Sequence, residues 1–291
     1  MRLSLLGLDI GGTNLKAAWL TPDGAVLGRV TVAAGGAIPR DELLATIART
    51  AREVAPGGVA RVGIAVGGAV QPDGTMTFGS TNLPNLAGIP LGETFAALLG
   101  APCRVEHDGR AAMRGEAWLG AARDVRNAMT LTFGTGIGAG LLLDGRIHSG
   151  AHDGAGEIGV WRLLPPPVSG GWPSVEDLAA PGGLELGRRA RDYAALIAAG
   201  TDSAEAAEYA AVFDLVGRSI ANAHLLLDLE VVVLIGGVTA LGEPFRAAVE
   251  AAFLAACPRE FRHGLAIRLG ALGPYCGAIG AAAQWQGDAE A

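Results

Sequence analysis

A short pattern that occurs twice constrains the fold of this chain more than any other feature. It is found at Leu8-Asp9-Ile10-Gly11-Gly12-Thr13-Asn14-Leu15-Lys16 and again at Leu131-Thr132-Phe133-Gly134-Thr135-Gly136-Ile137-Gly138-Ala139-Gly140. Each copy is an apolar strand, a Gly/Thr turn and a second apolar strand that runs to an Asp-Gly turn. Glycines let backbone N–H groups approach an anion, and Thr13, Asn14, Lys16 and Thr135 add side-chain donors. Ordinary hairpins also need glycine, but two such turns favour a duplicated phosphate-binding device that holds a nucleotide between two lobes.

Asp9 supports this interpretation because it is an acid inside an apolar strand. Its carboxylate would be buried without a partner there, which is costly. A metal ion would account for it, and magnesium is the usual companion of nucleotide phosphates. The first turn has neither the spacing of a P-loop nor that of a dinucleotide-binding motif, so both of those sites are excluded.

Composition excludes several classes of protein. With 291 residues, 50% of them hydrophobic, the chain can bury a large core and is expected to form one or two domains. A net charge of −7 without a block of Lys and Arg argues against nucleic acid and anionic membranes as partners. No apolar run reaches the ~18 residues of a transmembrane helix, and the N-terminus shows no signal peptide. The isolated cysteines Cys103, Cys257 and Cys276 indicate reduced thiols, so we expect a cytoplasmic protein.

Hydrophobic periodicity predicts strands that alternate with helices, and therefore an α/β protein with mostly parallel pairing in mixed sheets. The expected strands are 3–10, 16–20, 25–32, 61–66, 103–106, 231–235 and 265–269, and the expected helices start at Asp41 and cover 110–122, 183–199, 204–228, 243–256 and 278–285. Ligands gather at the carboxyl ends of strands in such sheets. Asp9, Gly67-Gly68, His107-Asp108, Thr135 and Gly236-Gly237 all follow strands, and we expect them to converge on one cleft.

These motifs, in this order, resemble those of the ROK family (repressors, open reading frames, kinases) of sugar kinases, within the actin/hexokinase/Hsp70 superfamily. The resemblance covers nearly the whole chain. Residues 9–16 resemble the first phosphate motif, Thr81-Asn82-Leu83-Pro84-Asn85-Leu86 the sugar-proximal loop, Glu106-His107-Asp108-Gly109 the catalytic Asn-Asp segment, Gly154-Ala155-Gly156-Glu157-Ile158-Gly159 the sugar-binding motif A-G-E-x-G-H, and Gly236-Gly237-Val238 the adenosine loop.

The resemblance implies a duplicated ribonuclease H-like fold with two lobes and a central cleft. A smaller N-terminal lobe would comprise residues 1–108, completed by a C-terminal helix within 277–291, and a larger lobe would comprise 109–276. The implied activity is transfer of the γ-phosphoryl group of ATP to a hexose, with Mg²⁺ as cofactor and glucose 6-phosphate as the foremost product. A homodimer is also implied.

Roles for individual residues follow from the resemblance. An Asp-Gly before a helix is more often a plain N-cap, but the place of Asp108 in the motif makes it the catalytic base. The implied sugar-binding residues are Gly67, Gly68, Thr81, Asn82, His107, Asp108, Glu157 and Glu176. The implied nucleotide- and phosphate-binding residues are Asp9, Gly11, Gly12, Thr13, Asn14, Lys16, Thr135, Gly136, Gly138, Gly236 and Gly237. Asp9 would also hold Mg²⁺ through water.

The chain departs from the family pattern at two places. Val160 stands where the family has a zinc-binding histidine, and residues 163–172 contain none of the family's zinc-binding cysteines. Since structural zinc needs about four Cys or His ligands, we predict that no zinc is bound. His107 replaces the asparagine before the catalytic aspartate, which leaves the identity of the sugar open.

Other functions remain as alternatives. Within kinases, the substrate can be mannose, allose or an N-acetylhexosamine, and polyphosphate can replace ATP as donor. A ROK transcriptional regulator would need a helix-turn-helix of roughly 60–80 residues ahead of the first turn, and the position of Asp9 disfavours it. A third alternative is a sugar-sensing pseudokinase, which the loss of the family histidine suggests. Asp108 and the two intact turns argue against it.

Overall fold

The computed structural model describes residues 4–68, 74–76, 82–134, 136–163, 174–175 and 204–287. The chain forms two compact units. The first unit comprises Met1–Arg123, Ile147–Ala155 and Leu272–Ala291, and the second comprises Asp124–Arg146 and Gly156–Ala271. The lobe limits expected at residues 108 and 276 stay a prediction, because a compact unit and a lobe that moves as one body are different things. Among the described residues, no helix has the length and apolar character needed to span a membrane.

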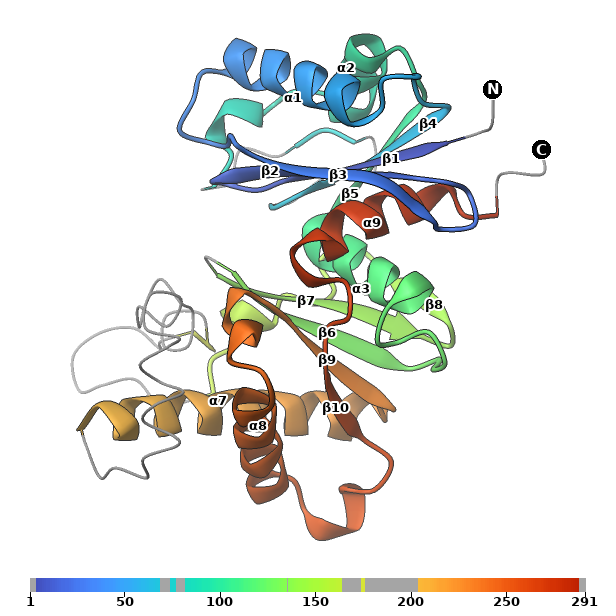
Figure 1. The fold of residues 1–291 in the computed structure, drawn as a ribbon. Coiled ribbons are helices and arrows are strands. Elements are labelled where there is room, and N and C mark those ends of the chain that lie inside the picture. The colour runs from blue at the N-terminus through green and yellow to red at the C-terminus, as the bar shows by residue number, and fades with distance from the viewer. Residues whose placement is uncertain are drawn as a thin grey trace. The chain divides into compact units, whose positions relative to one another are not determined.

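The first unit is a five-stranded mixed sheet with helices on both faces (Figure 1). The strands follow the order β3-β2-β1-β4-β5, with β1 (Leu5–Ile10), β2 (Asn14–Leu20), β3 (Val26–Ala33), β4 (Arg61–Val66) and β5 (Cys103–His107). Strands β1, β2 and β3 pair antiparallel, whereas β1, β4 and β5 pair parallel. Helices α1 (Arg40–Val54) and α2 (Leu91–Leu99) cover one face, and α3 (Asp108–Leu119) and α9 (Cys276–Ala282) lie on the other side.

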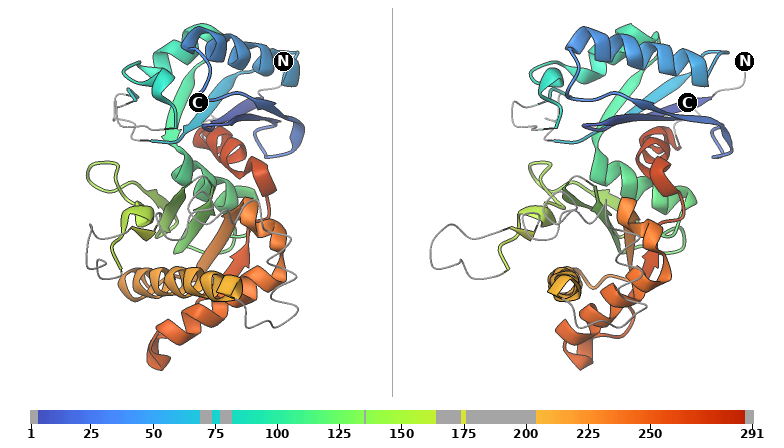
Figure 2. Two further views of the ribbon diagram at one scale, coloured as in Figure 1. Left: turned by 90° about the vertical axis from the view of Figure 1, so that its left-hand side faces the viewer. Right: turned by 60° about the vertical axis from the view of Figure 1, so that its left-hand side comes forward.

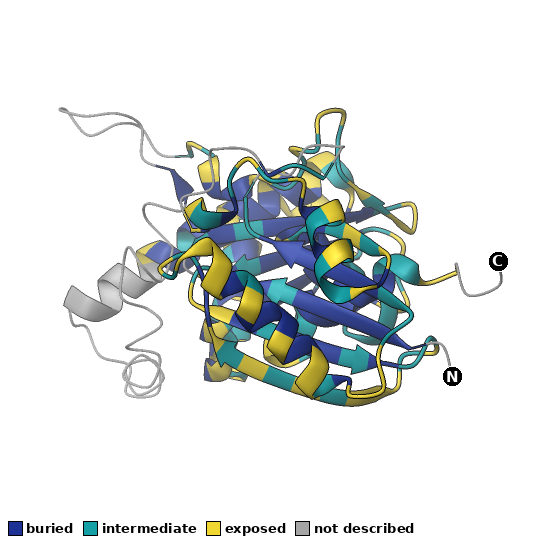
Figure 3. Cartoon of the chain, turned by 90° about the horizontal axis from the view of Figure 1, so that it is seen from above, coloured by how far each residue is buried: buried dark blue, intermediate teal, exposed yellow. Residues whose placement is uncertain are grey.

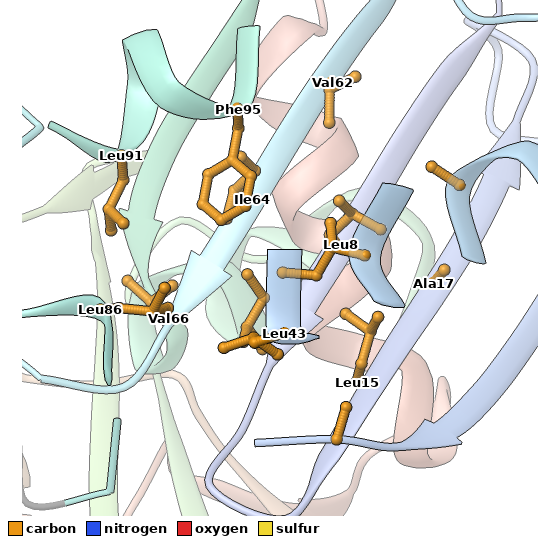
Figure 4. Close-up of a cluster of buried hydrophobic side chains, with 14 of the residues drawn as sticks. Leu8, Leu15, Ala17, Leu43, Val62, Ile64, Val66, Leu86, Leu91 and Phe95 are labelled. Carbon is orange, nitrogen blue, oxygen red and sulfur yellow. The ribbon is translucent and has the colours of Figure 1, made fainter. Parts of the chain in front are cut away.

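The burial pattern explains why these segments form the centre of the unit. Strands β1 and β4 are buried along almost their whole length because both sheet faces are covered, while edge strand β3 alternates between exposed and half-buried residues. Leu8, Ile64 and Phe95 are fully buried where the sheet meets α1 and α2 (Figure 4). Each such side chain contributes about 1.5–3 kcal/mol by leaving water. Figure 3 shows the same contrast between buried strands and helices with exposed outer faces.

The second unit contains another five-stranded sheet, in the order β10-β9-β6-β7-β8. Its strands are β6 (Ala128–Phe133), β7 (Ile137–Leu143), β8 (Arg146–His148), β9 (Val231–Gly236) and β10 (Ala266–Leu269). Helices α7 (Ala204–Leu227) and α8 (Glu243–Ala256) pack side by side (Figure 2). Phe245 of α8 joins them to the sheet, because its ring contacts both Phe133 of β6 and Phe213 of α7.

The two sheets have the same strand order. The first is β3-β2-β1-β4-β5, and the second, listed from its β8 edge, is β8-β7-β6-β9-β10. In both, the first strand pairs antiparallel with the second and parallel with the fourth. Hairpin β1–β2 therefore corresponds to hairpin β6–β7. The α/β class and the duplicated fold of the actin/hexokinase/Hsp70 superfamily, both expected from the sequence, are confirmed.

The backbone of helix α9 lies directly against the backbone of the first sheet, because most residues of the helix are Gly or Ala. Residues Gly277–Ala282 are all buried. A Cβ atom on Gly63 of β4 would overlap the Ala281 carbonyl, and one on Gly280 would overlap the Ala111 carbonyl of α3. The C-terminal segment is thus held between the sheet of the first unit and α3.

Some elements differ from the expectation. Helix α2 was not predicted, since its nine residues are too few to display a helical period. Helix α3 begins at Asp108, ahead of the expected residue 110, because the His107 side chain caps it by accepting the Gly109 N–H. The helix expected at 183–199 lies outside the described residues. Short 3₁₀ turns occupy Pro84–Leu86, Ile158–Val160, Gly237–Leu241, Arg259–Phe261, Gly273–Tyr275 and Ala283–Trp285.

Candidate active site

Asp9 lies at the carboxyl end of β1, opposite Lys16 of β2 in the antiparallel ladder. The Lys16 Nζ is 3.3 Å from the Asp9 Oδ2. Burial raises the pKa of the Asp9 carboxyl, Lys16 opposes that rise, and the negative charge of Asp108 adds to it. The expectation that Asp9 would lack a partner in the protein is therefore wrong, because the strand register supplies Lys16. This contact uses one of the three N–H donors of the Lys16 ammonium, and the others remain for the phosphate that the sequence predicts there.

The turn between β1 and β2 exposes its two polar side chains. The Gly11 N–H donates to the Asn14 carbonyl at 2.9 Å, and the Gly12 carbonyl accepts from Gly36 at 3.2 Å. Thr13 and Asn14 are exposed, so their side chains are available to a ligand. Gly12 contacts Asn82, since a Cβ atom on Gly12 would lie 3.2 Å from Asn82 Cβ. One predicted sugar-binding residue thus lies against the predicted phosphate-binding turn.

Asp108 begins α3 directly after β5. Its Oδ1 accepts the Gly109 N–H at 2.7 Å, and the His107 Nδ1 shares that proton at 3.2 Å. A helix N-terminus favours the ionised carboxylate that a general base needs. Gly67 leaves room for the carboxylate, because a Cβ atom there would lie 3.1 Å from Oδ2. The Asp108 side chain is 49% exposed and can reach a substrate. The structure therefore brings Gly67, His107 and Asp108 together.

Arg110, on the first turn of α3, makes a contact that the sequence does not predict. It is buried, and its Nη1 donates to the Asp153 carbonyl at 2.8 Å. Asp153 has a positive φ of 56° and lies in the loop that leads to Glu157. The helix that carries Asp108 is thereby tied to the segment ahead of the predicted sugar-binding motif.

In the second unit, the predicted nucleotide-binding glycines gather at one edge of the sheet. The Gly134 N–H closes the β6–β7 turn on the Gly136 carbonyl at 2.9 Å. Gly236 ends β9 directly beside Phe133, and its φ of 109° together with this close approach requires glycine. Cβ atoms on Gly138 and Gly237 would have no neighbouring atom within 4 Å among the described residues. This edge therefore offers backbone groups and space rather than charge.

Glu157 is exposed and lies at the start of the 3₁₀ turn Ile158–Val160. The preceding Gly156 packs on the Ala139 carbonyl of β7, which fixes the turn against the second sheet. Val160, at the family's histidine position, is 59% exposed. Thr81, Thr135, Glu176 and the Pro-rich stretch 165–167 lie outside the described residues. The expected convergence of all these residues on one cleft stays a prediction.

The residues of the first turn fit magnesium. No group of three or more His, Cys, Asp and Glu side chains that could hold a metal occurs in the described part of the chain. Magnesium does not require such a group, since it keeps several waters and takes one or two carboxylates together with phosphate oxygens. The Asp9 carboxylate, whose side chain is 15% exposed, could supply one such oxygen, because a nearby cation offsets the cost of its desolvation, as Lys16 does in this structure.

Comparisons with known proteins show the family of the chain. A glucokinase of Thermotoga maritima is 34% identical over 160 residues, which cover 54% of this chain and only half (50%) of that protein. An N-acetylmannosamine kinase of Yersinia pseudotuberculosis is 33% identical over 80% of this chain and 82% of its own length. The crystal structure of a ROK hexokinase from Thermus thermophilus matches with a TM-score of 0.80 at 28% identity, over 97% of both chains. The sequence profile of the ROK family matches residues 5–288, so the chain belongs to the ROK family.

Proposed function

We propose that this ROK sugar kinase transfers the γ-phosphoryl group of ATP to the 6-hydroxyl of glucose. One observation carries the proposal: an accessible carboxylate, Asp108, follows β5, and the Asp9–Lys16 pair lies at the end of β1, and these ends are on the same side of the sheet because β1, β4 and β5 are parallel. Phosphoryl transfer needs both parts, a base for the acceptor hydroxyl and charges that hold the phosphates.

In this mechanism, Asp108 Oδ2 accepts the proton of the sugar hydroxyl. The hydroxyl oxygen attacks the γ-phosphorus, the bond from that phosphorus to the β–γ bridging oxygen breaks, and ADP leaves with the electron pair. The Gly109 N–H holds Oδ1 at 2.7 Å, which leaves Oδ2 for the substrate. Thr13, Asn14 and Lys16 bind phosphate oxygens. Magnesium held by Asp9 through water would neutralise phosphate charge.

The sugar contacts proposed for this chain are Gly67, Gly68, Thr81, Asn82, His107, Glu157 and Glu176. The nucleotide contacts proposed for the second unit are Thr135, Gly136, Gly138, Gly236 and Gly237. Val160 removes a polar group that the family places near the anomeric end of the sugar. Loss of one neutral hydrogen bond weakens discrimination by about 0.5–1.5 kcal/mol, so selectivity at that hydroxyl is expected to be loose.

A panel of sugars and donors tests the proposal. Glucose, mannose, allose, N-acetylglucosamine and N-acetylmannosamine are each assayed for ADP release with ATP, and for product formation with polyphosphate. We expect the highest kcat/KM with glucose and ATP, and loss of activity with EDTA. No turnover with any pair, together with measurable glucose binding, would favour a sugar-sensing pseudokinase instead.

N-acetylmannosamine is the second candidate substrate, favoured by the Yersinia relative, which matches over most of its length. A higher kcat/KM for N-acetylmannosamine than for glucose would decide for it. The same preparation serves two further proposals, a homodimer in the cytoplasm and a zinc-free protein. Light scattering measures the molar mass and so tests the homodimer. Metal analysis that finds one zinc per chain would contradict the zinc-free protein.

A further inference from the structure

An ion pair between Glu106 and Arg114 connects β5 to α3, the two elements that meet at Asp108. Glu106, the penultimate residue of β5, is buried, and Arg114 lies on α3. The Arg114 Nη2 is 2.7 Å from Glu106 Oε1, and Nε is 3.0 Å from Oε2. Two parallel N–H···O bonds between a planar guanidinium and a carboxylate fix direction as well as distance.

Each end of this pair is anchored in a rigid element. Glu106 is paired with Ala65 in the parallel ladder of β4 and β5. Arg114 precedes Gly115, which packs directly on the Cys276 carbonyl and Gly280 of α9. The pair therefore ties the end of β5 to the second turn of α3, with Asp108 between them in the chain, and it resists a shift of α3 away from β5.

Asp108 lies inside that loop. Its side chain is about half exposed and is held by the N–H of Gly109, a residue of its own helix. The direction of the carboxylate therefore follows the direction of the helix end. We propose that Glu106 and Arg114 are positioning residues that aim Asp108 at the acceptor hydroxyl, an inference that rests on the proposed kinase function.

A purely structural role of the Glu106–Arg114 pair is distinguished from a positioning role by kinetics and not by stability. Glu106 is buried and Arg114 is partly buried, so removing one partner destabilises the protein whether or not the pair serves catalysis, and stability alone does not separate the two roles. Positioning predicts a loss in kcat at little change in the KM for sugar, since small misplacements of reacting groups are costly in rate. It also predicts that the loss depends on Asp108 being present.

The experiment compares Arg114→Met, Arg114→Lys and the control Arg49→Met, which breaks an exposed pair with Glu53 on α1 of the same unit. We expect Arg114→Met to lower kcat at least about tenfold with the sugar KM within about threefold. Arg114→Lys should fall between it and the parent, because lysine keeps the charge but not the fork. Arg49→Met should stay within about twofold of the parent. In an Asp108→Asn background, adding Arg114→Met should lower the residual rate less than about twofold.

Hydrogen exchange supplies a readout that does not depend on turnover. Exchange of the Gly109 amide should accelerate in Arg114→Met while the amides of β1 keep the parent rate. Unchanged kcat, an equal loss with and without Asp108, or faster exchange throughout the first unit would overturn the inference. A parent protein that phosphorylates no sugar would instead refute the proposed function, and Gly109 exchange would still test the positioning. If Arg114→Met fails to fold, the neutral double variant Glu106→Gln/Arg114→Met and Arg114→Lys carry the same test.

Discussion

The hairpin turns of the two units occupy corresponding places but differ in chemistry. The penultimate residue of β1 is Asp9, and it faces Lys16; the penultimate residue of β6 is Thr132, and it faces Gly138. In the first unit this pair is a partly buried carboxylate and an ammonium 3.3 Å apart. In the second, a buried hydroxyl without a hydrogen-bond partner among the described residues faces a glycine beside open space.

A second difference follows the last strand of each sheet. Strand β5 leads directly to Asp108 and α3, whereas β10 leads through the turn Gly273–Tyr275 to α9, whose residues are uncharged and, apart from Ile279, small. The two units share the strand order of their sheets but carry different residues at corresponding positions. The first unit concentrates charge, and the second offers glycine turns that leave space for a ligand.

The largest expected effect concerns Asp108, the proposed base, which follows β5 in the first unit. Asp108→Asn keeps the size of the side chain but cannot accept the proton, so kcat should fall at least ~100-fold. Sugar affinity should stay within about threefold, as measured by calorimetry alongside a coupled ADP assay. Asp144→Asn, at the exposed turn after β7, is the matched control. Turnover of Asp108→Asn within a few-fold of the parent would remove this residue from the mechanism.

The next effect separates the two penultimate residues. Asp9→Asn should raise the Mg²⁺ concentration for half-maximal activity by about tenfold or more, the usual cost of losing an outer ligand. Thr132→Val, which removes only a hydroxyl that has no hydrogen-bond partner in the described part of the chain, should leave that concentration unchanged. Titrations of both variants with Mg²⁺ at saturating ATP and sugar measure the contrast. Equal responses in the two variants would make Asp9 a structural residue and erase the comparison.

Two glycines sharpen the comparison through stability. A Cβ atom on Gly277 of α9 would lie 2.8 Å from Asp9 Oδ2, whereas one on Gly138 would meet nothing within 4 Å. Gly277→Ala should therefore cost about 1–3 kcal/mol in urea unfolding. Gly138→Ala should stay within about 0.5 kcal/mol of the parent while it raises the KM for ATP. The opposite ranking of stabilities would contradict the packing described for Asp9.

The smallest effect is a pH dependence of stability. Burial raises the pKa of Asp9 above its ordinary value near 3.8, so ionisation of Asp9 opposes folding. This cost is absent below that value and grows as pH rises through the raised pKa. Asp9→Asn lacks the cost, and its Tm should exceed that of the parent at pH 8 by a few degrees, since ~1 kcal/mol shifts Tm by about 2–4 °C. The difference should vanish near pH 4, and a lower Tm at pH 8 would show that the Lys16 contact outweighs the burial.

Sequence patterns were sufficient for the elements that rest on local periodicity. Strands β1, β4 and β9 are apolar runs that end at glycine or an acid, and each was predicted. Helix α2 was missed because it is short, and the partner of Asp9 was missed because it depends on strand register. That register was readable in principle, since residues 9 and 16 are equally distant from the centre of the turn.

The contacts of α3 were beyond prediction for a different reason. Glu106 and Arg114 are eight residues apart and belong to different elements, so no period of a helix or a strand relates them. Their contact depends on the angle between β5 and α3. Arg110 and Asp153 likewise meet only because a distant loop returns to this helix.

The close packing of α9 has a consequence for the order in which the protein is made. Strands β1 to β5 leave the ribosome early, yet one face of their sheet is completed by residues 276–282, near the end of the chain. Domains commonly fold as units while synthesis proceeds from the N-terminus, but here the half that is translated first is the half that is finished last. Until α9 is synthesised, the face of β1 and β4 that packs against it stays incompletely covered.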